Sequence, residues 1–160
     1  MITRIHAGFA RIPYSAVALL ARLSIAAVFW KSGQTKVEGL AIDIVGGSFE
    51  LGWPRLSDNA VALFRDEYRL PLISPELGAM LAALGEHALP VLLFAGLATR
   101  LSAAGLLAMT LVIQLLVYPG AYPTHGTWVA LLLMLMSLGP GALSIDHLLA
   151  RRSQAGGPGT

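Results

Sequence analysis

The stretch LAALGEHALPVLLF, residues 81–94, sets two adjacent polar residues, Glu86 and His87, inside an almost wholly apolar segment. The apolar segment extends from about residue 77 to 98, and a membrane-spanning helix needs about 20 such residues. A charged side chain near the middle of a span costs about 2.5–3.5 kcal/mol on insertion scales, so it is expected to have a partner. The stretch therefore predicts a membrane span whose two polar residues have a structural or functional purpose.

The composition of the whole chain is that of a membrane protein. Of its 160 residues, 56% are hydrophobic and 12% are charged, and the mean hydropathy is +0.69. Soluble domains have about 25% charged residues. The net charge is only +2, and no basic run is interleaved with aromatic residues, so no nucleic-acid partner is indicated. Without cysteine, this chain alone forms no disulfide, thiol redox pair or cysteine-bound iron–sulfur cluster.

Four segments are long and apolar enough to be membrane-spanning helices. They cover about residues 13–31, 77–98, 100–118 and 126–143. Because unpaired backbone groups are not tolerated in lipid, each segment is expected to be an α-helix. We predict an all-α membrane protein, an antiparallel four-transmembrane-helix bundle that forms a single domain over residues 1–150.

The distribution of Lys and Arg predicts the orientation in the membrane. Arg22 inside the first segment and Lys31 directly after it favour a retained span over a cleaved signal peptide. Each side of the membrane carries five basic residues, but those near the termini are compact and close to span ends. Those in the loop after the first span are spread among seven acids. We therefore place both termini in the cytoplasm and the protein in the bacterial inner membrane.

The extracytoplasmic loop, residues 32–76, is the only sizeable segment outside the predicted spans. IDIVGGSFELGW, residues 42–53, alternates loosely around two glycines, a pattern compatible with a small hairpin. SDNAVALFRDEYRLP, residues 57–71, begins with capping residues and has apolar residues at helical spacing, which predicts a short amphipathic helix on the outer membrane surface. The tail, residues 151–160, is predicted to be disordered.

Polar residues inside the spans form a predicted buried cluster. Arg22 and Glu86 lie at similar depth when residues are counted from the cytoplasmic ends, which predicts an ion pair between the first two spans. A structural bridge that only fixes helix packing is as compatible with this pattern as a functional pair. The predicted cluster is Arg22, Glu86, His87 and Gln114. The candidates for an outer mouth are Gln34, Lys36, Tyr118, His125 and Trp128.

His87 is the predicted functional residue of this cluster. Adjacent residues lie about 100° apart around a helix, so Glu86 and His87 serve different neighbours. We expect His87 to face the third and fourth spans, where a neutral imidazole donates from one nitrogen and accepts at the other. In the alternative, His87 and Gln114 only hydrogen-bond neighbouring helices. The aromatic residues at the outer end then form an interfacial belt of Tyr118, Tyr122 and Trp128. The sequence predicts no metal site and contains no self-contained catalytic motif.

Three short motifs lie at span ends. The first span ends in FWKSGQTK (29–36), the second contains Glu86 and ends in GLATR (96–100), and the fourth is followed by GPGALSIDHLL (139–149). These motifs resemble the DoxX family of small four-span bacterial membrane proteins. The matching positions are Gly33, Lys36, Glu86, Gly96, Gly139, Gly141, Ser144 and Asp146.

Two further stretches resemble a subgroup of that family, encoded beside small secreted metal-binding peptides. They are LFRDEYRLPLISPE (63–76) and MTLVIQLLVYPGAYPTHGTW (109–128). The resemblance implies a redox-associated protein, because the founding member of the family is a subunit of a quinone-linked oxidoreductase.

Two roles stay open at this point. The first is a quinone-interacting accessory subunit, for which Glu86, His87, Gln114 and Tyr118 supply hydrogen-bonding side chains. The second is a non-catalytic membrane factor in metal stress, or in export or maturation of a secreted metal-binding peptide. The expected cofactor is at most a quinone. The expected partners are the lipid bilayer and membrane or periplasmic proteins, and the sequence leaves the oligomeric state open.

Overall fold

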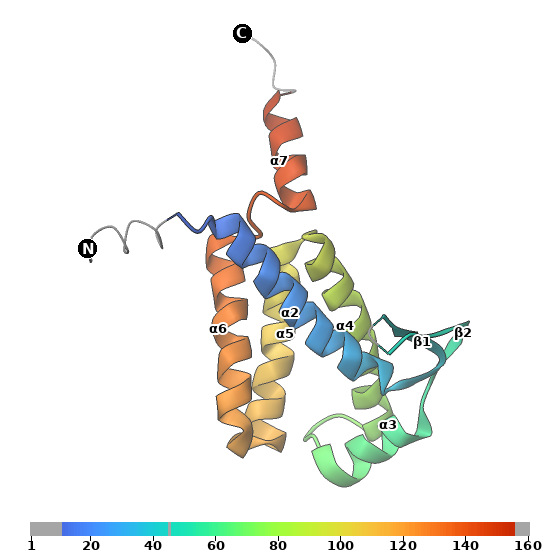
Figure 1. Ribbon diagram of the computed structural model, residues 1–160. Coiled ribbons are helices and arrows are strands. Elements are labelled where there is room, and N and C mark those ends of the chain that lie inside the picture. The colour runs from blue at the N-terminus through green and yellow to red at the C-terminus, as the bar shows by residue number, and fades with distance from the viewer. Residues whose placement is uncertain (1–10, 45, 156–160) are drawn as a thin grey trace.

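The computed structural model describes residues 11–44 and 46–155, which are mostly helical with one small sheet (Figure 1). Four long helices pack in a ring in which α2 contacts α4, α4 contacts α5, α5 contacts α6 and α6 returns to α2. Their bounds are α2 Tyr14–Gln34, α4 Pro75–Ala95, α5 Thr99–Val112 and α6 Tyr122–Leu138. A π-helical turn, η2 (Ile113–Val117), extends α5.

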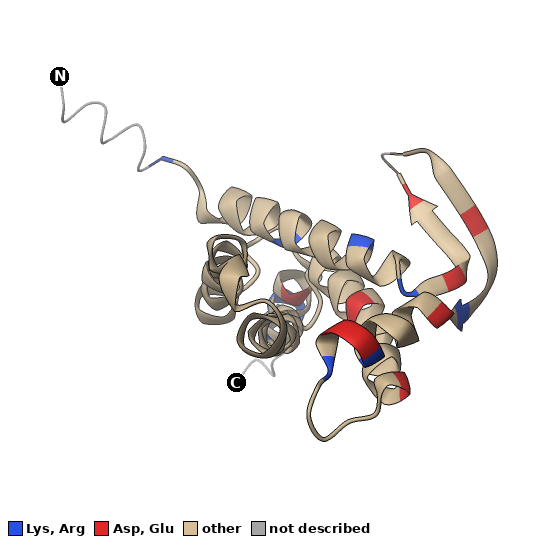
Figure 2. Ribbon diagram, turned by 90° about the horizontal axis from the view of Figure 1, so that it is seen from below, with Lys and Arg blue, Asp and Glu red and all other residues tan. Residues whose placement is uncertain are grey.

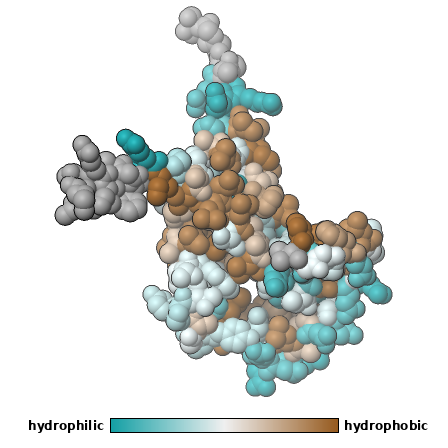
Figure 3. Space-filling model, in the orientation of Figure 1, coloured by the Kyte–Doolittle hydropathy of each residue, from teal (hydrophilic) through white to brown (hydrophobic). Residues whose placement is uncertain are grey.

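Three helical segments within the described ranges are long and apolar enough to cross a membrane: Tyr14–Gln34, Pro75–Ala95 and Thr99–Val117. α6 has 17 residues, at the lower end of the range of about 17–25 for spans, so a fourth span is not shown by these criteria. Large apolar side chains cover the middle of the molecule, whereas α7 and the end formed by α3 are more hydrophilic (Figure 3). This surface is typical of a protein surrounded by lipid.

The loop between α2 and α4 contains the expected hairpin and the expected helix. β1 (Val37–Asp43) and β2 (Ser48–Leu56) pair antiparallel, so the hairpin is longer at both ends than predicted and the fold is not purely α. α3 (Asp58–Leu63) begins where the Ser57 hydroxyl accepts a hydrogen bond from Asn59 N, and continues into the π-helical turn η1 (Phe64–Tyr68). The side-chain cap explains why the helix begins at this point.

The prediction of a disordered tail from residue 151 is wrong for the described part. α7 (Ile145–Ala155) is a helix that projects from one end of the bundle (Figure 1). Its first turn is stabilised because Ser144 Oγ accepts a hydrogen bond from His147 N at 3.2 Å. Residues 156–160 of the predicted tail lie outside the described residues.

α2 crosses α4 obliquely and in the opposite direction. Arg22 of α2 contacts Leu93 of α4, and Gly33 of α2 contacts Glu86 of α4. The two contacts are thus eleven residues apart along α2 but only seven apart along α4. At the crossing, a Cβ atom on Gly33 would lie 2.9 Å from two atoms of the His87 ring. The carboxyl end of α2 therefore reaches the middle of α4, and this geometry decides which residues meet Glu86.

Candidate functional site

The buried acid of α4, Glu86, pairs with Lys36 and not with Arg22. Glu86 Oε2 lies 2.7 Å from Lys36 Nζ, and the side chains are 3% and 4% exposed. Lys36 Nζ also lies 3.1 Å from Ser32 Oγ and donates to the Ser32 carbonyl at 3.3 Å. The predicted Arg22–Glu86 pair is wrong because the inclined α2 brings its carboxyl end, rather than its middle, to Glu86.

The Lys36–Glu86 contact leaves hydrogen-bonding capacity unused. Glu86 Oε2 lies 2.7 Å from the Lys36 ammonium, which is the distance of a charge-assisted hydrogen bond, and Ser32 also interacts with the carboxylate. A carboxylate has about four lone-pair positions, so Glu86 retains the capacity to accept a proton or a hydrogen bond.

Arg22 closes the opposite end of the α2–α4 contact. Its guanidinium donates to the carbonyls of Leu93 at 3.3 Å, Phe94 at 3.0 Å and Leu143. The last carbonyls of a helix have no partner within the helix, and a cation there is also favoured by the helix dipole. Arg22 thus satisfies backbone groups at the end of α4, which is a structural role.

His87 lies against the carboxyl end of α2, and not toward α5 and α6 as predicted. Its Nδ1 lies 2.7 Å from Ala83 O, and its Nε2 lies 2.9 Å from Gln34 Nε2. Gln34 Oε1 accepts from Ile42 N at 2.6 Å, so the Gln34 amide nitrogen donates to His87 Nε2. We therefore assign the proton of a neutral His87 to Nδ1, donating to Ala83. Both ring nitrogens are then occupied within the protein, so neither is left for the ligand-binding role predicted for His87.

Gln114 belongs to a separate group between α5 and α6. Its Oε1 accepts from His125 Nδ1 at 2.8 Å, and its Nε2 donates to Pro119 O at 2.8 Å. The His125 ring, 6% exposed, lies 5.0 Å from the ring of Trp128. The four residues predicted to form one cluster are thus distributed over three places: Arg22, the Glu86–His87 turn, and Gln114.

The outer-mouth candidates divide in the same way. Gln34 and Lys36 hold the Glu86–His87 turn, whereas His125 and Trp128 surround Gln114. Tyr118, at the end of η2, donates a hydrogen bond to Glu67 of η1. This bond, together with partial burial, raises the pKa of Tyr118. The bond ties the loop before α4 to the end of α5.

An apolar cavity of about 230 Å³ lies beside Glu86, between α4, α5 and the α3–η1 segment. Phe64, Tyr68, Met109 and Val112 form part of its wall, and the acidic residue Glu86 also lines it. Burial, and then the charges of Glu86 and Glu67, raise the pKa of Tyr68. The cavity thus combines apolar walls with one carboxylate and one phenol.

Sequence reasoning missed this cavity and Tyr68. It placed the amphipathic helix on the membrane surface, whereas Phe64 packs directly onto α4. The approach requires a glycine, because a Cβ atom on Gly78 would lie 2.7 Å from Phe64 Cδ1. The signal available in the sequence was therefore Gly78, one helical turn into α4 on the face that also carries Ala79 and Ala82.

The comparisons with known proteins identify the family. A family model described as DoxX matches residues 17–119, which include Lys36, Glu86 and the whole cavity. The chain belongs to the DoxX family. Neither the search of curated proteins nor the search of solved structures found a match.

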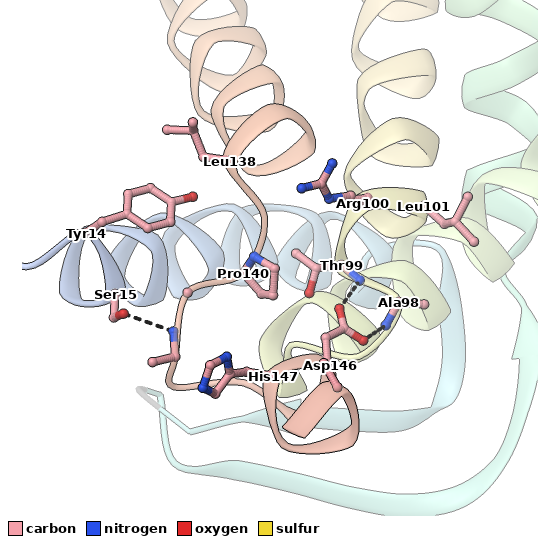
Figure 4. Close-up of a pocket in the computed structure, with 13 residues that line it drawn as sticks. Tyr14, Ser15, Ala98, Thr99, Arg100, Leu101, Leu138, Pro140, Asp146 and His147 are labelled. Atoms are coloured by element: carbon pink, nitrogen blue, oxygen red, sulfur yellow. Dashed lines mark hydrogen bonds between the residues drawn. The ribbon is translucent and has the colours of Figure 1, made fainter. Parts of the chain in front are cut away.

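The remaining DoxX-like motif residues hold the end of the bundle where α7 leaves it. Asp146 caps α5, because its two carboxylate oxygens accept from Ala98 N at 2.8 Å and from Thr99 N at 2.9 Å (Figure 4). Asp146 N donates back to Gly96 O at 2.9 Å. Ser144 Oγ donates to Gly141 O at 2.7 Å. These contacts are structural.

Gly96 of this DoxX motif cannot carry a side chain. Its φ of 68° is in the left-handed region, and a Cβ atom would collide with Arg22 Nη1 and lie 2.6 Å from Ser144 Cβ. Gly139 accepts a hydrogen bond from the Tyr14 hydroxyl at 2.6 Å, and Gly141 approaches Ser15. Thus the family motif outside the Lys36–Glu86 region serves packing.

Within residues 11–44 and 46–155, no three His, Asp or Glu side chains are grouped so as to hold a metal ion. The candidate functional site of this DoxX-family chain is therefore the Lys36–Glu86 pair with its apolar cavity.

Proposed function

We propose that this DoxX-family protein crosses the bacterial cytoplasmic membrane four times, with both termini in the cytoplasm. The support for α6 as the fourth span is its packing beside α5 and α2. The orientation is supported by Arg100, Arg151 and Arg152, which lie close to helix ends at one end of the bundle, whereas the basic residues of the hairpin and the α3–η1 segment are spread among acidic ones (Figure 2).

Cysteine labelling tests this topology, and the chain has no cysteine of its own to interfere. A membrane-impermeant thiol reagent added to intact spheroplasts should label Asn59→Cys and not Ser153→Cys. After lysis, both variants should react. Labelling of Ser153→Cys alone before lysis would reverse the orientation.

We further propose that the cavity beside Glu86 binds the head group of a membrane quinone. The observation that carries this proposal is the apolar cavity of about 230 Å³ that has the buried acid Glu86 in its lining. Small-molecule sites are typically apolar with a few placed polar groups. Phe64 and Met109 offer apolar surface to a ring, and Glu86 and Tyr68 offer polar partners to its oxygens.

The residues around the cavity suit binding and proton exchange. A quinone bound there supplies the capacity to take up two electrons and two protons. Lys36 and Ser32 hold the Glu86 carboxylate in place, and Glu86 is the buried group positioned to exchange a proton with a ligand. Because the chain has no cysteine for a thiol pair or cluster, we assign it the role of an accessory subunit that receives electrons from a partner.

Two substitutions of the same chemistry on α4 test the quinone proposal. Ala82 lines the cavity, whereas Ala88 is exposed on another face of the same helix. Ala82→Leu should lower the quinone that co-purifies in mild detergent by about tenfold, which corresponds to about 1.4 kcal/mol. Ala88→Leu should retain the wild-type amount. Equal retention by both variants, at equal amounts of monodisperse protein, would contradict the proposal.

A second candidate function is a non-catalytic membrane factor for metal stress, or for export or maturation of a secreted metal-binding peptide. The observation that favours it is the hairpin, which exposes Phe49, Leu51 and Trp53 from alternate positions of β2, by 65%, 82% and 87%. Under this role, Leu51→Glu should abolish metal resistance while Ala82→Leu leaves it unchanged. The opposite pattern favours the quinone role.

A further inference from the structure

A second cavity, of about 660 Å³, lies at the end of the bundle where α7 leaves it (Figure 4). It is bounded by the first turns of α2 and α5 and by the segment between α6 and α7. Its volume is in the range of about 300–1,000 Å³ that is typical of small-molecule sites. The quinone proposal makes no use of this cavity, which is at the other end of α4 from η1.

The polar groups in this cavity favour an anion. The side chains of Arg100 and His147 line it and make no ion pair or hydrogen bond within residues 11–44 and 46–155. The hydroxyl of Thr99 is fully buried without a hydrogen-bond partner. Asp146 also lines the cavity, but both of its carboxylate oxygens accept from the backbone of α5. A guanidinium, an imidazole and a hydroxyl are thus available to a ligand.

The wall of this cavity also includes exposed apolar residues. Leu101 of α5 and Leu138 of α6 form part of its wall, and they are 76% and 62% exposed. A ligand that occupies the whole cavity therefore contacts cationic groups and apolar lateral surface at once. An amphiphile with an anionic head group and apolar chains fits this combination. A free anion contacts only the polar part.

We propose that this cavity binds the phosphate head group of an anionic phospholipid from the cytoplasmic leaflet. Arg100 pairs with the phosphate, His147 and Thr99 lie beside it, and the acyl chains run along Leu101 and Leu138. Basic pockets between membrane helices on the cytoplasmic side are suited to anionic head groups. The proposal rests on the membrane placement proposed above and is independent of quinone binding.

Native mass spectrometry of the full chain in detergent tests the proposal. The probes are phosphatidylglycerol and phosphatidylcholine with identical acyl chains. Wild type should retain phosphatidylglycerol in preference to phosphatidylcholine. Arg100→Gln should lower the bound phosphatidylglycerol by about tenfold. Arg65→Gln is the matched control, because Arg65 is an exposed arginine on η1 at the opposite end, and it should leave binding unchanged.

Competition with inorganic phosphate distinguishes a lipid site from a site for free phosphate. Additional variants distinguish a binding defect from a folding defect. Inorganic phosphate at millimolar concentration should not displace the lipid; if it does, and also binds alone, the site takes free phosphate and the proposal is overturned. Equal lipid retention by wild type and Arg100→Gln also overturns it. If Arg100→Gln fails to fold, His147→Gln gives the comparison instead, and Arg100→Lys, which keeps the positive charge, should retain phosphatidylglycerol. Quinone retention should be unchanged in all of these variants, so the two proposals fail separately.

Discussion

Arg22 and Glu86 are both buried charges at the contact between α2 and α4, but their surroundings differ. The Arg22 guanidinium donates to three backbone carbonyls at the end of α4 and in the segment before α7. The Glu86 carboxylate faces one ammonium group, and Glu86 lies beside an apolar cavity. A charge surrounded by backbone carbonyls holds helices together, whereas a carboxylate with unused capacity beside a cavity is able to bind a ligand.

The largest expected effect is the loss of one partner of the buried ion pair. Glu86→Leu leaves the Lys36 ammonium buried without a counter-charge, which typically costs about 3–5 kcal/mol. The double variant Lys36→Leu/Glu86→Leu should recover much of that loss, because two apolar side chains replace the pair. Thermal unfolding in detergent measures both. The double variant Arg22→Leu/Glu86→Leu is the control and should show no recovery, since Arg22 has other partners.

The next effect is at Arg22 itself. Arg22→Leu leaves the Phe94 and Leu143 carbonyls without their donor, at a cost of about 1–3 kcal/mol. Arg22→Lys should not restore stability, because one ammonium group does not reproduce the fork of guanidinium donors. Thermal unfolding and the yield of monodisperse protein are the measurements. Full rescue by lysine would show that charge alone, and not the set of carbonyl contacts, is the role of Arg22.

A smaller effect is expected at the cap of α5. Asp146→Ala removes the acceptor of Ala98 N and Thr99 N and should cost about 0.5–2 kcal/mol, as for other helix caps. Asp146→Asn should recover part of this, because an amide oxygen still accepts one of the two bonds. Denaturation monitored by circular dichroism compares the variants. If Asp146→Ala is as stable as wild type, Asp146 does not stabilise the start of α5.

The smallest effect is expected at His87. His87→Ala removes hydrogen bonds to Gln34 and Ala83 and the edge contact with Trp30, at a cost of about 0.5–1.5 kcal/mol. Quinone retention should be unchanged, because His87 does not line the cavity. If a stably folded His87→Ala protein loses its quinone, His87 takes part in ligand binding and the structural role given to it here is wrong.

The sequence predicted local structure well because local signals define it. Apolar length located the helices, the two glycines after Ile44 located the hairpin, and Ser57 located the start of α3. The motif residues also identified the family. Ser144, which caps the start of α7, is a local signal as well. The composition of the tail instead led to the prediction of disorder from residue 151.

The partners of the buried residues were not predicted, because they depend on helix inclination. Counting residues from the membrane surface assumes parallel helices, and this assumption paired Glu86 with Arg22. The oblique α2 instead brings Lys36 to Glu86 and Gln34 to His87. The cavity depends on one more long-range contact, that of Phe64 with Gly78. No periodicity within a single segment carries that information.

The most direct test of the central claim is a high-resolution density map of the protein purified with its native lipids and quinones. The account predicts planar density between Phe64 and Met109, with a polar edge within hydrogen-bond distance of Glu86. It predicts no ligand density at Arg22. Acyl-chain density throughout the cavity, or an ordered ligand at Arg22 in place of Glu86, would contradict the account.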